Sequence, residues 1–467
     1  MSDHLFPRYH VRPARGYLND PNGPIVVDGC SHLYFQYRHT VDLDAPVEWA
    51  HVTSDDLVHW RYHRPAMAPH PFGDDRDGCW SGNTVVDASG NVRAFYSGFV
   101  ADEPLQRTLV ATSTDGGSTF GEPRVAVPAP AAAEGVLHLR DPFVWREGDT
   151  WRMALGAGVS GAGDDGSNDG TAMVRLYESR DLETWTPAGL LGCLPRTRTG
   201  EWDSGCMWEC PQILRYGARM VALVGGWSPE TGVMRVLSFV APDAVDPDVD
   251  PSSLSLVDRG PNFYAASVMP ESPLGPLMWG WATEGRAWNW CEADGWSGTL
   301  TLPRLVSLRP DGSLASAPLP ALSSLRTSPE GRPVDGELDG LPAQLEFALD
   351  ASAASGPCRL RLRFGAEEYL DITVDAVAGT VVVDREHASA DPRADGGVSA
   401  ASGLDGLRNR AGEGSVRGFM DGSILELFVP DGPAFTVRMY PTTPPPWRVE
   451  LSGDPDARAM VWEQSRF

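Results

Sequence analysis

The segment Ser54-Asp-Asp-Leu-Val-His-Trp60 begins with Ser-x-Asp and ends with an aromatic residue. The same pattern returns as Ser113-Thr-Asp-Gly-Gly-Ser-Thr-Phe120 and as Ser179-Arg-Asp-Leu-Glu-Thr-Trp185. Repeats with a period of this length, rich in strand and turn residues, are typical of β-propeller blades, each a small sheet whose faces are covered by its neighbours. The repeat therefore predicts a propeller.

Apolar runs typical of strands recur beside and beyond these segments, at intervals between 50 and 75 residues. They are His32–Tyr37, Val92–Phe99, Thr150–Ala157, Met220–Trp227 and Pro276–Ala282. The 50 glycines and 40 prolines favour short strands with frequent turns over long helices. Five units of this kind fill residues 5–305, and an unrelated run of hairpins in a sandwich is the alternative.

The composition changes after this region. Residues 305–335 are rich in Ser, Pro and Gly, and beyond them short runs alternate apolar with polar residues. These runs are Gln344–Leu349, Arg359–Phe364, Tyr369–Val374, Thr380–Val383, Ile424–Val429 and Phe435–Tyr440. We therefore expect an all-β chain with a five-bladed β-propeller over 1–310, a linker or domain edge over 311–335 and a C-terminal β-sandwich over 336–467.

Charge and composition restrict the partners. The 467-residue chain has 38 basic and 63 acidic residues, a formal net charge of −25, which disfavours nucleic acid and anionic membranes. No apolar run is long enough for a membrane helix. Seven scattered cysteines fit a reduced interior, so we expect a cytoplasmic protein. Cys206 and Cys210 lack a second ligand pair and the ten histidines are not clustered, so we expect small buried cysteines, no metal and no cofactor.

Three carboxylates stand in unusual contexts. Asp20 lies in Asn-Asp-Pro-Asn-Gly, Asp141 in Arg-Asp-Pro and Glu209 in Trp-Glu-Cys-Pro. Taken singly, these are a tight turn, a surface ion pair and the end of an edge strand. Each, however, stands near the start of an expected blade strand. Because the inner strands of a propeller converge on its central channel, the three acids are expected to meet at one end of it.

These three motifs, in this order, resemble those of glycoside hydrolase family 32, the invertase and β-fructosidase family. Further matching stretches are Phe35-Gln36-Tyr37, Trp80-Ser81-Gly82, Phe263-Tyr264-Ala265, Gly295-Trp-Ser-Gly-Thr-Leu-Thr-Leu-Pro-Arg304 and Asp421-Gly-Ser-Ile-Leu-Glu-Leu-Phe428. The resemblance covers nearly the whole chain. It implies a five-bladed propeller that carries the active site, followed by a β-sandwich.

The resemblance also implies roles for the three acids. Asp20 would be the nucleophile, Glu209 the general acid/base and Asp141 a stabiliser of the transition state, with Arg140 fixing the orientation of Asp141. A retaining mechanism of this type places the two reacting carboxyl groups about 5–5.5 Å apart. The implied substrate-binding residues are Asn19, Asn22, Gln36, Trp49, Trp80, Ser81, Arg140 and Trp296.

The expected function is hydrolysis of terminal β-D-fructofuranosides in sucrose or short fructo-oligosaccharides. A fructosyltransferase and a sucrose-6-phosphate hydrolase remain alternatives, with Arg38 and Arg286 as phosphate-binding candidates. An inverting propeller glycosidase for arabinan or xylan and a non-catalytic sugar-binding propeller are further ones. Tyr17-Leu18, Arg38-His39 and Asn262 depart from the family's usual residues. The departures leave the leaving-group side open, and the sequence predicts no oligomeric state.

Overall fold

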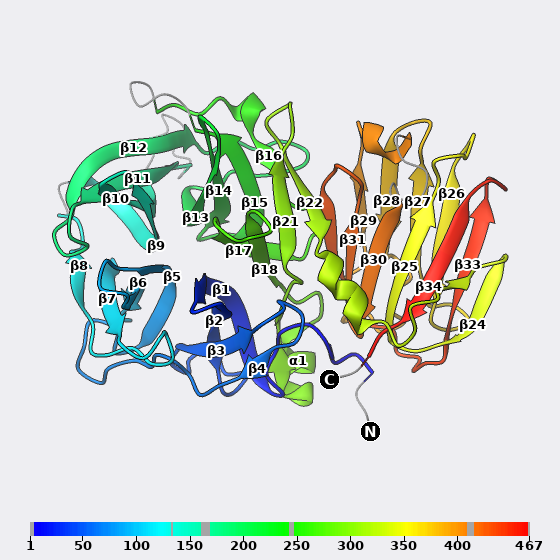
Figure 1. Ribbon diagram of the computed structural model, residues 1–467, viewed down its shortest axis with the longest axis horizontal. Coiled ribbons are helices and arrows are strands. Elements are labelled where there is room, and N and C mark those ends of the chain that lie inside the picture. The colour runs from blue at the N-terminus through cyan, green and yellow to red at the C-terminus, as the bar shows by residue number, and fades with distance from the viewer. Residues whose placement is uncertain (1–3, 132–133, 160–168, 242–246, 409–414, 466–467) are drawn as a thin grey trace.

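The strands are arranged in two lobes, a ring of five sheets and a pair of six-stranded sheets (Figure 1). The computed structural model describes residues 4–131, 134–159, 169–241, 247–408 and 415–465. The chain passes once around the ring and then enters the pair of sheets, which confirms the all-β propeller-plus-sandwich prediction. Both ends of the chain lie near the junction of the lobes. In the described part of the chain, no helix has the length and apolar character that crossing a membrane requires.

The five sheets of the ring follow one another along the sequence, and within each sheet neighbouring strands are largely antiparallel. The strands of blades one to three are β1 (Gly16–Val27), β2 (Cys30–Arg38), β3 (Glu48–Ser54) and β4 (Arg61–Tyr62); β5 (Gly78–Val86), β6 (Val92–Phe99), β7 (Arg107–Ser113) and β8 (Arg124–Val127); and β9 (Val136–Glu147), β10 (Thr150–Val159), β11 (Thr171–Ser179) and β12 (Thr186–Pro195).

Blades four and five complete the ring. Their strands are β13 (Met207–Tyr216), β14 (Arg219–Ser228), β15 (Gly232–Val240) and β16 (Ser255–Leu256), and then β17 (Phe263–Met269), β18 (Leu277–Ala282), β20 (Thr299–Leu300), β21 (Arg304–Leu308) and β22 (Leu314–Pro318). Between β18 and β20 the chain forms the short helix α1 (Trp288–Asp294) and the strand β19 (Trp296–Ser297). Strand β19 pairs in parallel with β1, so the last blade is joined to the first and the ring is closed.

The Ser-x-Asp repeat is a turn held by its own side chains. Ser54 accepts a hydrogen bond from the backbone N–H of Leu57 at 2.8 Å, and Asp56 accepts two more from the residues that follow. Ser179 and Asp181 make the same bonds at the end of β11. Each turn thus satisfies backbone donors where the third strand of a blade ends, which explains why the motif has the period of the blades.

The second lobe is a sandwich of two six-stranded sheets. One sheet contains β23 (Arg332–Pro333), β25 (Gln344–Asp350), β30 (Val416–Asp421), β31 (Ile424–Phe428), β32 (Ala434–Arg438) and β34 (Arg458–Glu463). The other contains β24 (Glu337–Leu341), β26 (Cys358–Arg363), β27 (Tyr369–Asp375), β28 (Thr380–Asp384), β29 (Val398–Ala401) and β33 (Trp447–Gly453). Alternate residues of β26 and β27 are buried between the sheets, as their polar–apolar alternation predicts.

The domain boundary is sharper than the sequence suggested. The linker expected over 311–335 contains β22, the outermost strand of blade five, and β23, which belongs to the sandwich. Only a 3₁₀ helix, Pro320–Leu325, and short turns separate them. The segment expected as a linker or domain edge therefore contains strands of both domains, because strands this short leave no periodic pattern in a Ser- and Pro-rich stretch.

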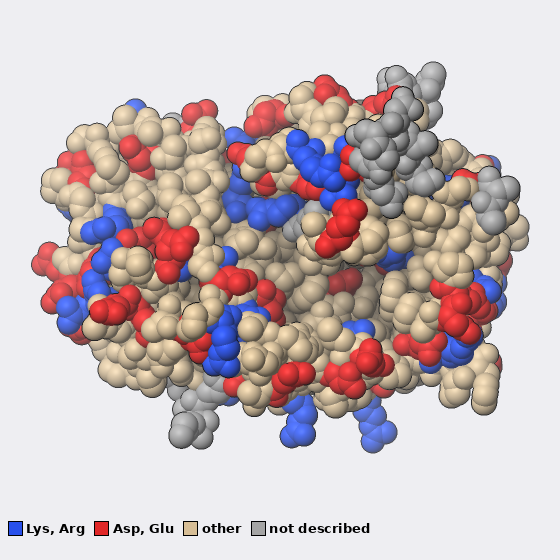
Figure 2. All heavy atoms as spheres, turned by 180° about the vertical axis from the view of Figure 1, so that it is seen from behind, with Lys and Arg blue, Asp and Glu red and all other residues tan. Residues whose placement is uncertain are grey.

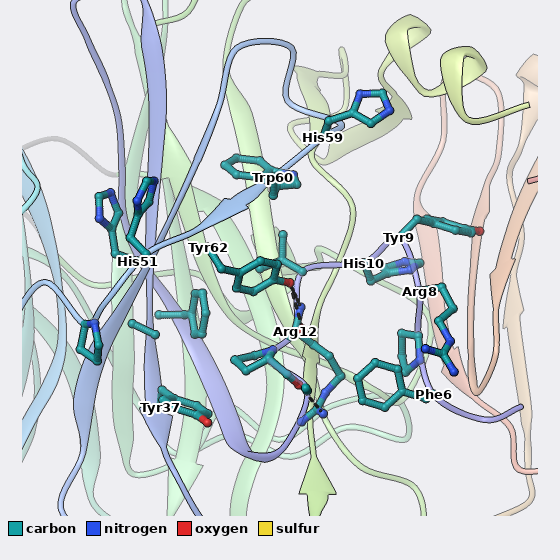
Figure 3. Close-up of a pocket in the computed structure, with 18 of the residues that line it drawn as sticks. Phe6, Arg8, Tyr9, His10, Arg12, Tyr37, His51, His59, Trp60 and Tyr62 are labelled. Atoms are coloured by element: carbon teal, nitrogen blue, oxygen red, sulfur yellow. Dashed lines mark hydrogen bonds between the residues drawn. The ribbon is translucent and has the colours of Figure 1, made fainter. Parts of the chain in front are cut away.

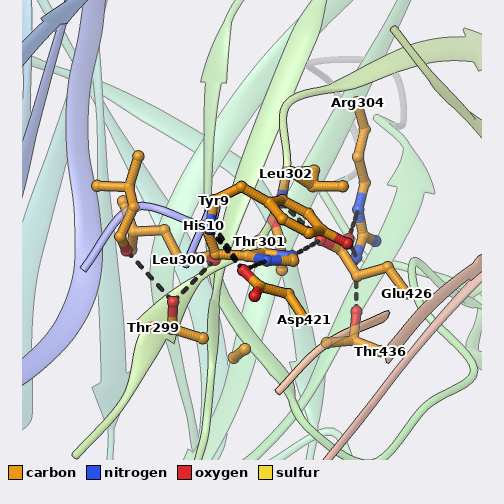
Figure 4. A network of polar contacts seen from close by, with 12 residues as sticks. Tyr9, His10, Thr299, Leu300, Thr301, Leu302, Arg304, Asp421, Glu426 and Thr436 are labelled. Atoms are coloured by element: carbon orange, nitrogen blue, oxygen red, sulfur yellow. Dashed lines mark hydrogen bonds and ion pairs between the residues drawn. The ribbon is translucent and has the colours of Figure 1, made fainter. Parts of the chain in front are cut away.

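A buried network of charges joins the two lobes (Figure 4). Arg304 of the propeller contacts Asp258 of blade four at 2.7 Å and donates from Nε to Glu426 of β31 at 3.0 Å. The other oxygen of Glu426 lies 3.1 Å from Nε2 of His10. The side chains of Arg304 and Glu426 are both completely buried. Each charge in this network is thus compensated by a partner from another part of the chain.

The N-terminal segment is held by the sandwich. The carboxylate of Asp421 accepts hydrogen bonds from the backbone N–H groups of Arg8, Tyr9 and His10 at 2.7–3.0 Å. Burial by itself lowers the pKa of His10, but the hydrogen bonds with Asp421 and Glu426 outweigh it and raise that pKa above its usual value. The segment that leads into β1 is therefore fixed by two acids of the Asp421–Phe428 motif.

Replacing Arg304 by methionine should lower the free energy of unfolding by about 3–5 kcal/mol, because Asp258 and Glu426 would be left buried without their cation. Urea unfolding followed by tryptophan fluorescence measures the change. Arg309→Met is the matched control, since Arg309 is partly exposed and pairs only with residues of its own turn. An equal loss in both variants would contradict the role given to the network.

Candidate active site

Each of the five innermost strands carries a β-bulge near its N-terminal end. In each, two residues stand opposite a single residue of the second strand: Asn19-Asp20 in β1, Trp80-Ser81 in β5, Asp141-Pro142 in β9, Cys210-Pro211 in β13 and Ala265-Ala266 in β17. A bulge interrupts the alternation of a strand and re-aims its side chains. The repeated bulge brings residues from separate blades together at one end of the ring.

Three bulged residues have a left-handed backbone that is uncommon outside glycine. Asp141 has φ of 64°, Cys210 of 45° and Ala265 of 46°. Such conformations persist only where the surrounding structure enforces them, and they concentrate at functional sites. The strain therefore marks the same end of the ring as the carboxylates do.

Asp20 is surrounded by hydrogen-bond donors from three strands. Ser81 donates to Oδ2 at 2.6 Å, Asn19 to Oδ1 at 3.1 Å and the Gln36 amide to Oδ2 at 3.4 Å. The thiol of Cys210 lies 3.7 Å from Oδ2. The structure thus brings together four of the residues predicted from sequence, with donors around the expected nucleophile.

In the absence of substrate, the ionised form of Asp20 is disfavoured in spite of these donors. Burial raises the pKa of Asp20 to about 6, and the nearby charge of Glu209 adds to the effect, whereas the bonds from Ser81 and Asn19 oppose it. The carboxyl group therefore ionises about two pH units above an exposed aspartate.

Asp141 lies beside Asp20 across the channel. Its Oδ2 accepts a hydrogen bond from the backbone N–H of Cys210 at 3.0 Å and lies 3.6 Å from the Cys210 thiol. Its own backbone N–H donates to Ser97 at 2.7 Å. Burial raises the pKa of Asp141 to about 7; the charge of Arg140 opposes this shift and the charge of Glu209 adds to it. The two aspartates thus share one poorly solvated space.

Cys210 is a site residue that the sequence argument took for a small buried side chain. Its thiol lies between the carboxylates of Asp20 and Asp141. The left-handed backbone of Cys210 turns this thiol into the channel, a change that strand alternation alone does not predict. The pattern that identifies it is the repeated bulge, once the five inner strands are aligned.

Glu209 has two strong partners. The Arg140 guanidinium contacts Oε1 at 2.6 and 3.1 Å, and the hydroxyl of Tyr264 contacts Oε2 at 2.6 Å. Arg140 was expected to orient Asp141, but its nearest approach to that carboxylate is 3.9 Å. Its main partner is therefore Glu209, because a planar guanidinium is directed along one pair of bonds at a time.

Tyr264 is a second residue that the sequence argument did not assign to the site. Its hydroxyl lies 2.6 Å from Glu209 and 2.9 Å from the carbonyl oxygen of Gly226, which can only accept. The single phenolic proton goes either to Gly226 or to Glu209. In the first case the phenol oxygen accepts from a protonated Glu209, and in the second it donates to the carboxylate. Tyr264 therefore bonds to both protonation states of Glu209.

Aromatic rings line the rim beside Arg140. The half-buried Trp80 stacks on Phe99 with ring centroids 4.1 Å apart. The guanidinium of Arg140 lies 5.9 Å from the Trp80 ring and 4.9 Å from that of Trp227. Two indoles thus hold the cation that contacts Glu209, and Trp227 joins the residues that the sequence argument missed.

Three residues expected to bind substrate are instead packed behind the site. Asn22 is fully buried and accepts a hydrogen bond from the backbone of Gly82, which ties β1 to β5. Trp49 is fully buried and donates to the carbonyl oxygen of Trp80 at 3.0 Å. Trp296 is 2% exposed, with the Arg286 guanidinium 4.1 Å from its ring. All three side chains are buried in the absence of substrate, and a contact between them and a sugar stays a prediction.

Two protein-family models match this chain, and they divide it where the two lobes meet. The model of the glycosyl hydrolases family 32 N-terminal domain matches residues 10–318, and that of the family 32 C-terminal domain matches residues 321–455. The chain belongs to glycosyl hydrolase family 32. It is therefore a glycosidase, as the three motifs predicted.

Relatives of this family member match over almost their full length. Sucrose-6-phosphate hydrolase of Zymomonas mobilis is 30% identical over 461 residues, covering 92% of this chain and 85% of the relative. Raffinose invertase of Escherichia coli is 29% identical over 464 residues, covering 93% and 90%. Among solved structures, sucrose-6-phosphate hydrolase from Lactobacillus gasseri superposes with a TM-score of 0.81 at 23% identity, covering 100% of this chain and 94% of that one. The β-fructofuranosidase of Bombyx mori superposes with a TM-score of 0.78 at 25% identity, covering 100% and 95%.

Replacing Asp20 by asparagine should stabilise the fold above pH 6. An Asp20 pKa raised to about 6 means that its ionised form destabilises the folded state, a penalty absent below the unfolded pKa near 3.8 and complete above 6. We expect the Tm of Asp20→Asn to exceed that of the parent by on the order of 2 °C at pH 7.5 and to match it at pH 4.

The Asp56→Asn variant is a control of opposite sign. Asp56 is partly buried, but hydrogen bonds from His59 and Val58 outweigh that burial and lower its pKa to about 2. Its charge therefore stabilises the fold above pH 4, and its removal should lower Tm at pH 7.5. A lower Tm for Asp20→Asn at pH 7.5, or a difference that does not depend on pH, would contradict the environment described for Asp20.

Proposed function

We propose that this family 32 enzyme is a retaining β-fructofuranosidase that cleaves terminal fructosyl units from sucrose and short fructo-oligosaccharides. The observation that carries the proposal is the meeting of Asp20, Asp141 and Glu209, from three separate blades, around one channel. The curated relatives include several sucrose-6-phosphate hydrolases and a raffinose invertase, which supports a fructoside as substrate.

The first step joins the sugar to Asp20. Asp20 attacks the anomeric carbon of fructose as the bond from that carbon to the leaving-group oxygen breaks, and Glu209 gives its proton to that oxygen. Positive charge builds on the fructose ring during this step. Ser81, Asn19 and Gln36 hold the Asp20 carboxylate in position, so little rearrangement is needed when it reacts.

The second step releases fructose. Glu209, now ionised, takes a proton from water as the water oxygen attacks the anomeric carbon and the bond to Asp20 breaks. Arg140 and Tyr264 hold the Glu209 carboxyl group through both steps. The double role of the Tyr264 hydroxyl fits a group that must be an acid in one step and a base in the next.

Asp141 and Asn19 are placed to bind the fructose hydroxyls. Asp141 reaches the channel from β9, and Asn19 Oδ1 is buried without a hydrogen-bond partner among the described residues. A buried acceptor without a partner costs free energy that a substrate hydroxyl recovers. Contacts of this kind strengthen as the ring flattens, and they therefore favour the transition state.

The two arginines expected as phosphate ligands already have partners within the protein. Arg286 has no exposed side-chain surface and is bonded to Glu284 and to the Trp296 carbonyl, so it is not available to a phosphate group. Arg38 donates to the Ala45 carbonyl and lies 5.3 Å from the ring of Tyr17. On the face seen in Figure 2, acidic side chains are spread over both lobes.

A small cavity near Tyr17 adds to this argument. It is about 440 Å³ in volume and is lined by Leu43 and Trp288 together with the acids Asp42, Asp44 and Glu292. These carboxylates repel a phosphorylated sugar. All seven cysteines are free thiols, which fits the cytoplasmic location that we propose. Transfer of the fructosyl group to a second sugar stays the alternative outcome of the same intermediate.

Asp20→Ala and Glu209→Ala should each lower sucrose hydrolysis by several orders of magnitude while the protein stays folded, because one removes the nucleophile and the other the proton donor. The assay follows hydrolysis of sucrose, sucrose 6-phosphate and 1-kestose, with products resolved and folding checked by circular dichroism. Asp311→Ala, in an exposed turn, is the control.

The same experiment tests stereochemistry and substrate class. In the presence of methanol, a retaining enzyme forms methyl β-D-fructofuranoside, and the α anomer would contradict the mechanism. Substantial residual turnover in either variant would contradict the assignment of that acid. A higher kcat/KM for sucrose 6-phosphate than for sucrose would contradict the substrate class, and a predominance of oligosaccharides at high sucrose would show a transferase.

Tyr264→Phe should lower kcat/KM for sucrose by about 10–100-fold, because the hydrogen bond to Glu209 is lost. Turnover of p-nitrophenyl β-D-fructofuranoside in its first step should change little, since nitrophenolate leaves without a proton. Tyr216→Phe is the matched control: Tyr216 lies on the same strand as Glu209 but bonds to the Val306 carbonyl. An equal loss on both substrates would mean that Tyr264 acts through folding and not through Glu209.

A further inference from the structure

A second cavity lies between the N-terminal segment and blade one (Figure 3). It has a volume of about 740 Å³, within the range of small-molecule sites, about 300–1,000 Å³. Phe6 and Arg8 lie on one side, Tyr37 and His51 on the other, and Tyr62 between them. The cavity is large enough for a ring compound.

The cavity is separate from the active site, although one strand serves both. Phe35 and Tyr37 of β2 line the cavity, whereas Gln36 between them contacts Asp20. Successive side chains of a strand point to opposite faces. The cavity is therefore on the other face of the strand that holds Gln36.

The charge of the lining is opposite to that of the whole protein. Among the described residues, two arginines and five histidines line the cavity and no Asp or Glu does. The chain as a whole has a formal net charge of −25. Three of the five histidines, His10, His39 and His59, pair with acids outside the lining, so the attraction for an anionic ligand comes from the two arginines.

Arg12 is a buried cation bonded only to neutral groups. It is 4% exposed, and its guanidinium donates to the backbone carbonyl oxygens of Pro13, Gly16, Ser297 and Gly298. Burial lowers the pKa of Arg12 to about 9, so it stays charged at neutral pH. No carboxylate in the described part of the chain forms an ion pair with it, although the charge of Glu284 acts on it and favours its charged form.

Arg8 and the aromatic residues complete the lining. The guanidinium of Arg8 lies 5.1 Å from the ring of Phe6, which Arg12 approaches to 5.2 Å. Tyr62 is 50% exposed, and the half-buried Trp60 lies next to it. His51 is 2% exposed, and its Nδ1 has no hydrogen-bond partner among the described residues. The cavity thus offers cations, flat apolar faces and one unsatisfied polar atom.

We propose that this cavity is a second binding site, which takes a small phosphorylated ring compound such as a sugar phosphate or a nucleotide. The phosphate group binds Arg8 in the field of Arg12, since a guanidinium matches phosphate oxygens in pairs. The ring packs against Trp60 and Tyr62. The proposal does not depend on which glycoside the enzyme cleaves.

Isothermal titration calorimetry at low ionic strength tests the site with glucose 6-phosphate, AMP, inorganic phosphate and uncharged glucose. We expect at least one of the two phosphorylated ring compounds to bind with a Kd of about 1 mM or tighter. Inorganic phosphate and glucose should bind more weakly, because each lacks half of the recognised chemistry. The compound that binds more tightly identifies the ring.

Arg8→Ala should weaken this binding about tenfold or more, and Trp60→Ala should also weaken it. The contact of Arg8 with Asp421 is made by its backbone, so the substitution keeps the segment in place. Arg15→Ala, an exposed arginine of the same segment that does not line the cavity, should leave Kd unchanged. No saturable binding of either ring compound at about 10 mM, equal binding of glucose or phosphate, or equal losses in Arg8→Ala and Arg15→Ala would overturn the proposal.

Discussion

Three carboxyl groups held against one guanidinium are the constraint on which this site depends. Burial and the charge of Glu209 raise the pKa values of Asp20 and Asp141, while Arg140 bonds to Glu209 and opposes the shift of Asp141 from 3.9 Å. A site with this excess of negative charge is costly in the free protein. It becomes favourable when positive charge develops on a bound sugar, because the charges are already oriented and poorly screened by water. The protein thus bears in its resting state a cost that the transition state relieves.

The repeated bulge is the backbone feature that brings these charged groups together. A regular strand would direct adjacent residues to opposite faces, so Glu209 and Cys210 could not both approach Asp20 and Asp141. The bulge in β13 removes this restriction. In blade five the bulged pair is Ala265-Ala266, which is buried, and the preceding Tyr264 reaches across to Glu209. The same bulge therefore presents acids in some blades and hydrogen-bond donors in others, according to the residues that each blade carries there.

Features that produce a local sequence pattern can be predicted from the sequence. The direction in which an individual side chain points cannot. The Ser-x-Asp turns reveal the blades because they are local structures held by their own side chains. The three acids are identified by motif and order. Asn22 belongs to the motif of Asp20, but its side chain is fully buried, as is that of Trp49. Arg140 pairs with a residue 69 positions away and not with its neighbour, which no local pattern encodes. The same holds for Tyr264 and Cys210, whose roles become visible only when the bulges are aligned.

The sandwich takes part in the site through the N-terminal segment. Asp421 and Glu426 fix residues 8–10, and Arg12 then bonds to the carbonyl oxygens of Gly16 and Ser297, where β1 and β19 close the ring. Only a few residues separate this anchor from Asp20. If the sandwich did not hold the segment, the first strand of the ring would have no fixed start, and Asp20 would lose the register that aligns it with Ser81 and Cys210. The Asp421–Phe428 motif therefore accompanies the three acid motifs for a mechanical reason: from the other lobe, it positions the strand that carries Asp20.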